Sequence, residues 1–341
     1  MEHFKFFFTL FILFVFCGRI NAQIYPDSTV HRLIVKGIDS IVDEDYESAE
    51  RIFQTLHQFN KSLPIVDIYL AGTEIAKSFD YKIPFNEKKI TYHLDRATVI
   101  TDKLLLEDDK NIWHIYFRAL TDGYRAYFNA LRGNWLSAFS EGYNAVASFE
   151  KCLLIDTSFY DAYIAVGSYK YWRSRKTSFL SWLPFIKDEQ DEGIQILSRA
   201  IKFSPYNSHL AYNSLIWIYI DRKEFKRAAE LAETVLLQHP KSRFFKWSYA
   251  RAVEEFDKEK ANAVYYDIMS SYEVSSEQNR INEIVLKHKI AQNLVKLGKK
   301  KEASILLKNI LSYKNLSTYE SEVLKDRMNR VKSHLNELNK K

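Results

Sequence analysis

The sequence predicts an all-α protein built from a row of paired helices. Its 341 residues contain only 9 glycines and 6 prolines, so few positions force a helix to break. Apolar residues recur every three or four positions along most of the chain, which places them on one face of a helix. The alternation of apolar and polar residues that marks half-buried strands is absent from the sequence.

The first 22 residues have the outline of a secretory signal peptide. Lys5 gives a short basic start, residues 6–16 are an apolar run, and Ala22 is a small residue at the expected cleavage point. The run is shorter than the roughly 20 residues that a membrane-spanning helix needs, and no later segment is long and apolar enough. The sequence therefore predicts export to the periplasm or the extracellular space, with an uncleaved N-terminal anchor as the alternative.

The two cysteines predict neither a lipid anchor nor a disulfide. Cys17 follows Phe16, whereas a lipid-modified cysteine follows a small residue. Only Cys152 remains after cleavage, so the fold must depend on its apolar core. The amphipathic helical pattern around Cys152 indicates a buried, inert thiol.

Fifteen helices are expected from the periodicity, and two prolines help to place them. Pro64 suits the first turn of a helix, and Pro84 should end or interrupt one. The helices are predicted near residues 28–42, 45–60, 64–79, 86–106, 110–132, 134–155, 159–174, 189–203, 207–221, 223–238, 241–257, 259–272, 276–297, 299–313 and 316–339.

Residues 211–240 carry the spacing of a helical repeat. Tyr212, Leu215 and Tyr219 share one helix face, Ala228 lies in the next helix, and Pro240 follows. This spacing resembles the tetratricopeptide repeat, a helix–turn–helix unit of about 34 residues. Other segments keep parts of the pattern: Gly37, Tyr46, Ala49 and Phe53; Gly133 and Ala138; Trp247, Ala250 and Ala263; Ala291, Leu294, Gly298, Ala303 and Leu307. The resemblance implies a right-handed α-solenoid of tetratricopeptide-like hairpins, and the whole is similar to secreted tetratricopeptide proteins of Gram-negative bacteria.

Small residues recur in the second helix of each pair. The set is Ala49, Gly193, Ala228, Ala263 and Ala303, and three of its members stand 35 residues apart (228−193 and 263−228). Small side chains allow two helices to approach closely. We therefore predict that these residues are buried where the two helices of a hairpin touch.

The chain is expected to divide into four parts. Residues 1–22 are the signal peptide, and residues 23–155 form a degenerate repeat region whose long helices fit the repeat period poorly and favour a bundle-like section. Residues 156–315 form more regular repeats. Residues 316–341, rich in Lys, Glu and Asn, are predicted to form a polar C-terminal helix that caps the stack.

Residues 173–188 are an insertion within one hairpin. Gly167 and Gly193 stand 26 residues apart (193−167), where the repeat expects about 12. Phe179, Trp182 and Phe185 would make an adhesive patch if water surrounded them. The insertion is therefore predicted either to pack against neighbouring helices as a small core or to form a lip that binds a partner.

No pattern of residues predicts catalysis, a metal or a cofactor. The sequence has no phosphate-binding glycine loop, no G-x-S-x-G motif and no pair of histidines at the spacing of a zinc-binding helix. Two acidic runs, Asp43-Glu44-Asp45 and Glu107-Asp108-Asp109, precede predicted helices, where carboxylates stabilise the positive end of the helix dipole. His93 and His114 are expected to be core or surface histidines. The sequence therefore predicts a protein that is not an enzyme.

The resemblance to tetratricopeptide proteins implies a binding groove. In that family the first helix of each hairpin lines a concave surface, and six candidate residues map there: Tyr127, Tyr171, Trp172, Asn213, Trp217 and His288. Aromatic rings supply contact area, while amide and hydroxyl groups hold a peptide main chain or sugar hydroxyls. The prediction is a scaffold or adaptor of the cell envelope that binds a protein or peptide. The alternative is a glycan- or peptide-binding helical protein of the outer-membrane uptake type.

The charge distribution adds one feature to the prediction. The net charge is +6, and residues 281–341 hold 14 Lys and Arg against 6 Asp and Glu. Such a segment is typical of a solvated helical face, with an acidic partner or anionic lipid as the alternative. A nucleic-acid partner is not expected for an exported protein.

Overall fold

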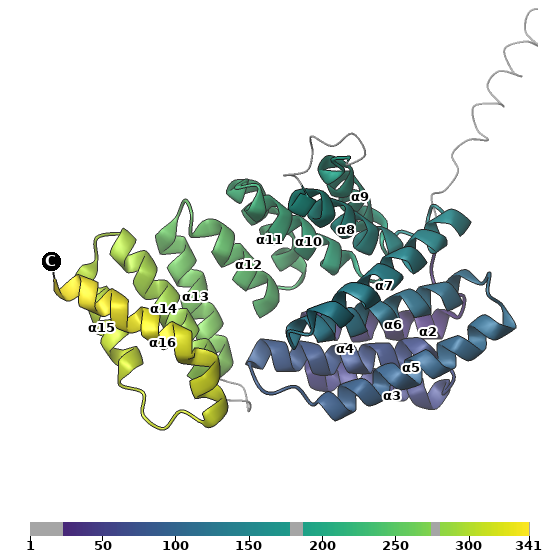
Figure 1. Ribbon diagram of the computed structural model, residues 1–341, viewed down its shortest axis with the longest axis horizontal. Helices are drawn as coiled ribbons and strands as arrows, with labels where there is room; N and C mark the ends of the chain where they lie inside the picture. The colour runs from purple at the N-terminus through teal and green to yellow at the C-terminus, as the bar shows by residue number, and fades with distance from the viewer. Residues whose placement is uncertain (1–22, 178–186, 274–279, 341) are drawn as a thin grey trace, which may run out of the picture.

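The computed structural model describes residues 23–177, 187–273 and 280–340, and Figure 1 shows them as a row of helices. Within these ranges all fifteen predicted helices are present and no strand occurs. The helices are α2 (Ser28–Val42), α3 (Tyr46–Phe59), α4 (Pro64–Tyr81), α5 (Glu87–Glu107), α6 (Ile112–Leu131), α7 (Trp135–Ile155), α8 (Ala162–Thr177), α9 (Gln190–Phe203), α10 (Ser208–Asp221), α11 (Phe225–Gln238), α12 (Arg243–Val253), α13 (Lys258–Glu273), α14 (Arg280–Lys296), α15 (Lys300–Leu311) and α16 (Thr318–Asn339).

Most helix ends agree with the prediction within three residues. The helix expected to start at residue 159 begins at Ala162, because Asp161 is drawn into buried hydrogen bonds with Ser204 and Asn207. The helix expected to reach residue 257 ends at Val253, and the carboxylate of Asp257 instead accepts a hydrogen bond from the backbone N–H of Lys260 at the start of α13.

The helices pack as seven hairpins in chain order: α2–α3, α4–α5, α6–α7, α8–α9, α10–α11, α12–α13 and α14–α15. The first helices of successive hairpins also contact one another, as α4 does with α6, α8 with α10 and α10 with α12. α16 lies against both α14 and α15, so it closes the end of the stack as predicted (Figure 1). This packing is that of an α-solenoid.

A small residue stands fourth in the second helix of most hairpins. The fully buried members are Ala49, Ala228, Ala261 and Ala303, and Gly193 holds the same place in α9. A Cβ atom on Gly193 would lie only 2.6 Å from the carbonyl oxygen of Gly167, so α8 and α9 touch backbone to backbone. The prediction was wrong for Ala263, which is exposed; α13 begins two residues earlier than the 35-residue spacing implies and buries Ala261 instead.

The turn inside four hairpins has the same backbone geometry. Glu44, Gly133, Lys223 and Gly298 each stand two residues before the second helix, with φ of 62°, 77°, 61° and 77°. This left-handed conformation suits glycine and costs other residues about 1 kcal/mol. The turn is therefore set by the packing of the hairpin, since Glu and Lys adopt it where glycine is absent.

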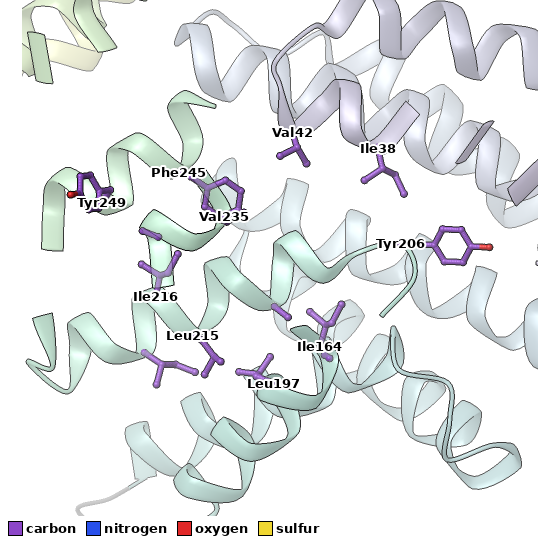
Figure 2. Packing of buried hydrophobic residues seen from close by; sticks show 14 of the residues in the cluster. Ile38, Val42, Ile164, Leu197, Tyr206, Leu215, Ile216, Val235, Phe245 and Tyr249 are labelled. Atoms are coloured by element: carbon purple, nitrogen blue, oxygen red, sulfur yellow. The ribbon is translucent and has the colours of Figure 1, made fainter. Parts of the chain in front are cut away.

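One apolar cluster runs through the stack, from Val30 in α2 to Val331 in α16. In Figure 2, Ile38 and Val42 point from α2 toward the later helices that carry Val235 and Phe245. The first hairpin thus shares a core with hairpins that follow it by almost 200 residues. Cys152 is fully buried in the same cluster, and burial raises the pKa of its thiol to about 12, in line with the predicted inert cysteine.

The repeated turn predicts opposite effects of two substitutions. Gly298→Ala should destabilise the protein by about 1 kcal/mol, because an added Cβ meets nothing within 4 Å and the whole cost is backbone strain. Lys223→Gly should be neutral to stabilising, by up to about 0.5–1 kcal/mol, because it relieves the same strain. Urea unfolding followed by circular dichroism measures both. Two changes of the same sign would contradict the shared geometry.

Candidate functional site

The solenoid curls back on itself, and polar contacts tie the first hairpin to later ones. The hydroxyl of Tyr206, between α9 and α10, accepts a hydrogen bond from the backbone N–H of Tyr25 at 2.8 Å and lies 2.8 Å from Nδ1 of His31. Further along, Nδ1 of His239 lies 2.9 Å from the carboxylate of Asp43. These contacts place the N-terminal end of the described chain against the middle of the array.

Asn207 is the centre of a buried hydrogen-bond network behind this contact. Its side-chain amide donates to the hydroxyl of Tyr116 at 3.1 Å and to Asp161 at 3.0 Å, and accepts from Tyr69 at 3.3 Å. Burial raises the pKa of Asp161 to about 6, although hydrogen bonds from Ser204 and Asn207 oppose this shift. The network joins α4, α6 and the turns before α8 and α10, so it fixes how four hairpins meet.

A buried ion cluster closes the second contact. Arg243, at the start of α12, lies with its Nε 3.0 Å from the Asp80 carboxylate and 3.1 Å from Oε2 of Glu44. The hydroxyl of Tyr272 donates to the Asp80 carboxylate at 2.8 Å, and Nδ2 of Asn282 donates to the Asp80 carbonyl at 2.8 Å. Arg243 and Asp80 together therefore link the α2–α3 turn, the end of α4 and three helices of the C-terminal half.

Glu44 and Asp80 are two carboxyl groups that share one guanidinium. Burial, together with the nearby Asp80 carboxylate, raises the pKa of Glu44 against the lowering effect of Arg243. The prediction for the run at 43–45 was thus right for Asp45, which caps α3, and wrong for Glu44, which is a buried partner of Arg243. In the run at 107–109, the Asp108 carboxylate accepts from the backbone N–H of Lys110.

Two of the six predicted groove residues are core residues. Tyr171 has 0% of its surface exposed and donates its hydroxyl to Asp221 at 2.8 Å. His288 is also 0% exposed, and its Nε2 lies 3.0 Å from Nδ1 of His334 in α16. Both were misplaced because the repeat pattern gives a residue's position in its hairpin but not the helices that close over it.

Several basic side chains surround the buried imidazole of His288. Burial, with Arg327, His334, Arg330 and Lys289 around it, lowers the pKa of His288 to about 3. A neutral imidazole is therefore required where α16 docks on α14. His288 thus has a structural place in the cap rather than a place on a binding surface.

Three of the predicted groove residues, Trp172, Asn213 and Trp217, lie on α8 and α10, and two polar pairs join these helices. Oγ of Ser168 donates to Oγ of Ser214 at 3.0 Å, and Nε of Arg175 donates to Asp221 at 2.8 Å. In both pairs the α10 residue stands 46 positions after the α8 residue (214−168 and 221−175). The same offset places Trp172 of α8 opposite Ile218 of α10. We define the α8–α10 surface as Ser168, Trp172, Asn213 and Trp217.

The α8–α10 surface combines an exposed ring with an unused acceptor. Trp217 is 41% exposed, whereas Trp172 is partly buried with its ring edge-on to Tyr171 at 5.1 Å. One helical turn before Trp217, Oδ1 of Asn213 is shielded from solvent and accepts no hydrogen bond from the described part of the chain. Tyr127, 46% exposed in α6, lies outside this surface.

The insertion residues Phe179, Trp182 and Phe185 lie outside the described residues. The two ends of the insertion can be described. The backbone N–H of Glu189 donates to Oγ of Ser174 at 2.9 Å, and Nζ of Lys170 donates to the Glu189 carboxylate. The insertion therefore leaves and re-enters the hairpin at one point.

Sequence reasoning missed one contact between a histidine and a buried carboxylate, and one cavity. His93 lies with its Nδ1 2.7 Å from the carboxylate of Asp67, which is 1% exposed. A cavity of about 230 Å³ near α3 and α4 is lined by acidic and basic side chains, with Nζ of Lys89 held 2.9 Å from Glu50 and 3.0 Å from Glu74. His114, by contrast, is at the surface near the carbonyl of Asp108.

In the described ranges, no three His, Cys, Asp or Glu side chains are grouped so that they could hold a metal, and no helix is long and apolar enough to cross a membrane.

The fold is an all-α solenoid of helical hairpins. Among solved structures it is similar to a tetratricopeptide repeat protein from Parabacteroides merdae, with 14% sequence identity and a TM-score of 0.40. The similarity covers 90% of this chain and 100% of the other. No family model matches the sequence, and no curated protein matches it. A likeness this distant carries no argument about function, which has to be argued from the chain itself.

Loss of the buried arginine should open the curled array. Arg243→Ala should destabilise the protein by about 3–5 kcal/mol, because Asp80 is then left charged and buried. Arg227→Ala is the matched control, since Arg227 is 59% exposed and its pair with Glu224 should contribute less than about 1 kcal/mol. Chemical denaturation measures both variants. An Arg243→Ala variant as stable as the control would contradict the closure.

Acid should weaken the docking of α16 through His288. Below its ordinary pKa of about 6.5, His288 binds a proton in the unfolded chain but not in the folded one, so stability falls as the pH drops from about 6.5 toward 4. His288→Gln should reduce this loss in the free energy of unfolding by about 1–2 kcal/mol, whereas His57→Gln should leave the loss unchanged. Denaturation at a series of pH values tests this; parallel profiles for all three proteins would contradict it.

Proposed function

We propose that the protein is an exported, non-enzymatic scaffold that holds a protein or peptide on the α8–α10 surface. Export rests on the first 22 residues of the sequence. The solenoid supports a binding role, because stacked hairpins present side chains from several helices on one continuous surface.

The observation that carries the proposal is the pairing of Trp217 with Asn213. An indole that is 41% exposed offers apolar area and a donor, and the shielded Oδ1 of Asn213 is an acceptor unused in the described chain. A buried acceptor without a donor costs about 1–3 kcal/mol, which a peptide N–H would recover once the side chains that shield this atom move aside. Ser168 and Trp172 extend the same surface along α8.

A glycan is the second candidate for this surface. A sugar ring stacks on an exposed indole, and an amide oxygen accepts from a sugar hydroxyl, so Trp217 and Asn213 suit it chemically. A peptide fits better because Ser168 and Ser214 satisfy each other, which leaves few hydroxyl partners for a sugar. A glycan array separates the two ligands.

Capture of partners tests the proposal. The chain starting at Gln23 is immobilised and exposed to envelope extract, and bound proteins are quantified by mass spectrometry. Trp217→Ala should lower capture of a specific partner at least about tenfold, as loss of an aromatic anchor does. Leu237→Ala is the control, because Leu237 is 84% exposed on α11. The same proteins captured equally by all three chains would contradict a binding role for this surface.

A further inference from the structure

The first half of α7 presents a row of large apolar side chains to solvent. Trp135 is 70% exposed, Leu136 88%, Phe139 75% and Tyr143 59%. We define these four residues as the α7 ridge. Trp135, Phe139 and Tyr143 follow one another at intervals of four residues, so they form a single ridge along the helix.

Close packing of α7 on α6 turns this ridge outward. A Cβ on Gly142 would lie 3.8 Å from the Cβ of Ala126, and the amide of Asn129 donates to the Glu141 carboxylate at 2.8 Å. These small and polar residues hold one face of α7 against α6, which leaves the opposite face uncovered.

The length of α7 explains why the next hairpin does not cover the ridge. α7 has 21 residues and α8 has 16, and the two are joined at the far end of α7. At 1.5 Å per residue, α7 is about 7 Å longer than α8. The ridge therefore lies on the part of α7 farthest from that connection.

We propose that the α7 ridge is the interface of a homodimer, in which α7 of one copy lies antiparallel to α7 of a second. The surface area of the ridge supports a second copy of the chain as the partner. From their exposed fractions, the four side chains present about 550 Å² of surface in each copy. A symmetric pair would remove about 1,100 Å² before flanking atoms are counted, close to the roughly 1,200 Å² at which stable interfaces begin.

The chemistry of the ridge favours a second copy over other partners. The other exposed residues on this part of α7 are Ser140 and Asn144, both uncharged. A membrane-binding helix would place Lys or Arg beside the rings, and the nearest cation, Arg132, is paired with Glu87 at 3.0 Å. An uncharged ridge can face its own copy without repulsion, and a two-fold axis near residue 140 brings Leu136 of one copy to Tyr143 of the other.

Sedimentation equilibrium of the chain starting at Gln23 tests the proposal over concentrations from about 1 to 200 µM. The native chain should shift from monomer to dimer across this range. The double variant Leu136→Glu, Phe139→Glu should raise the dissociation constant at least about 100-fold. Leu237→Glu is the matched control, since it adds charge at an equally exposed leucine on α11 and should leave the dimer intact. Circular dichroism should show the same helicity in all three.

Cross-linking tests whether the two-fold axis of the dimer lies near residue 140. Ser140→Cys should join to its own copy with a short bis-maleimide, and Ser198→Cys, an exposed residue of α9, should not. A native chain that stays monomeric at all concentrations would overturn the proposal. So would a dimer that survives the double variant. A monomer that binds phospholipid vesicles through the ridge would assign this face to a membrane instead.

Discussion

The close approach of two helices at one small residue is the contact on which the rest of the structure depends. Where Ala49, Gly193, Ala228, Ala261 or Ala303 stands fourth in the second helix, that residue is buried and the two helices approach closely. In the α2–α3 and α10–α11 hairpins, Glu44 and Lys223 also accept a left-handed conformation in the turn, which shows that packing outweighs local preference by at least the strain involved. Because most hairpins share this close contact, small rotations between them accumulate into curvature.

That curvature brings the first hairpin back onto the later ones, and its contacts decide which surfaces remain for binding. The Asn207 network and the Arg243 cluster join segments that lie up to about 200 residues apart in sequence. Both bury polar groups that are satisfied only when the array is curled. Trp217, which is 41% exposed, stays accessible in this curled array.

The sequence predicted the local structure well because hairpins are made by neighbours. The bounds of α2 agree in full, and Ala49, Ala228 and Ala303 are buried as expected. It failed for Tyr171, His288 and Glu44, since each is buried by helices whose approach leaves no periodic signal. It failed for Ala263 because a shift of two residues in where α13 starts changes which side chain faces inward. Trp217 and Asn213 share one turn of α10, so the sequence could place them together, and their part in binding stays a prediction.

The two exposed aromatic surfaces differ in a way that separates their roles. The α8–α10 surface pairs a ring with an unsatisfied amide, so it can discriminate between ligands by hydrogen bonds. The α7 ridge has aromatic rings and no charged side chain, so it offers apolar contact area but little means of selecting a ligand. Such a surface suits a second copy of the same chain, whose position is set by two-fold symmetry. If two copies join through α7, each carries its own α8–α10 surface, and a partner with two binding segments engages both. The second segment then binds at a high effective concentration, so modest contacts at Trp217 are sufficient for stable capture.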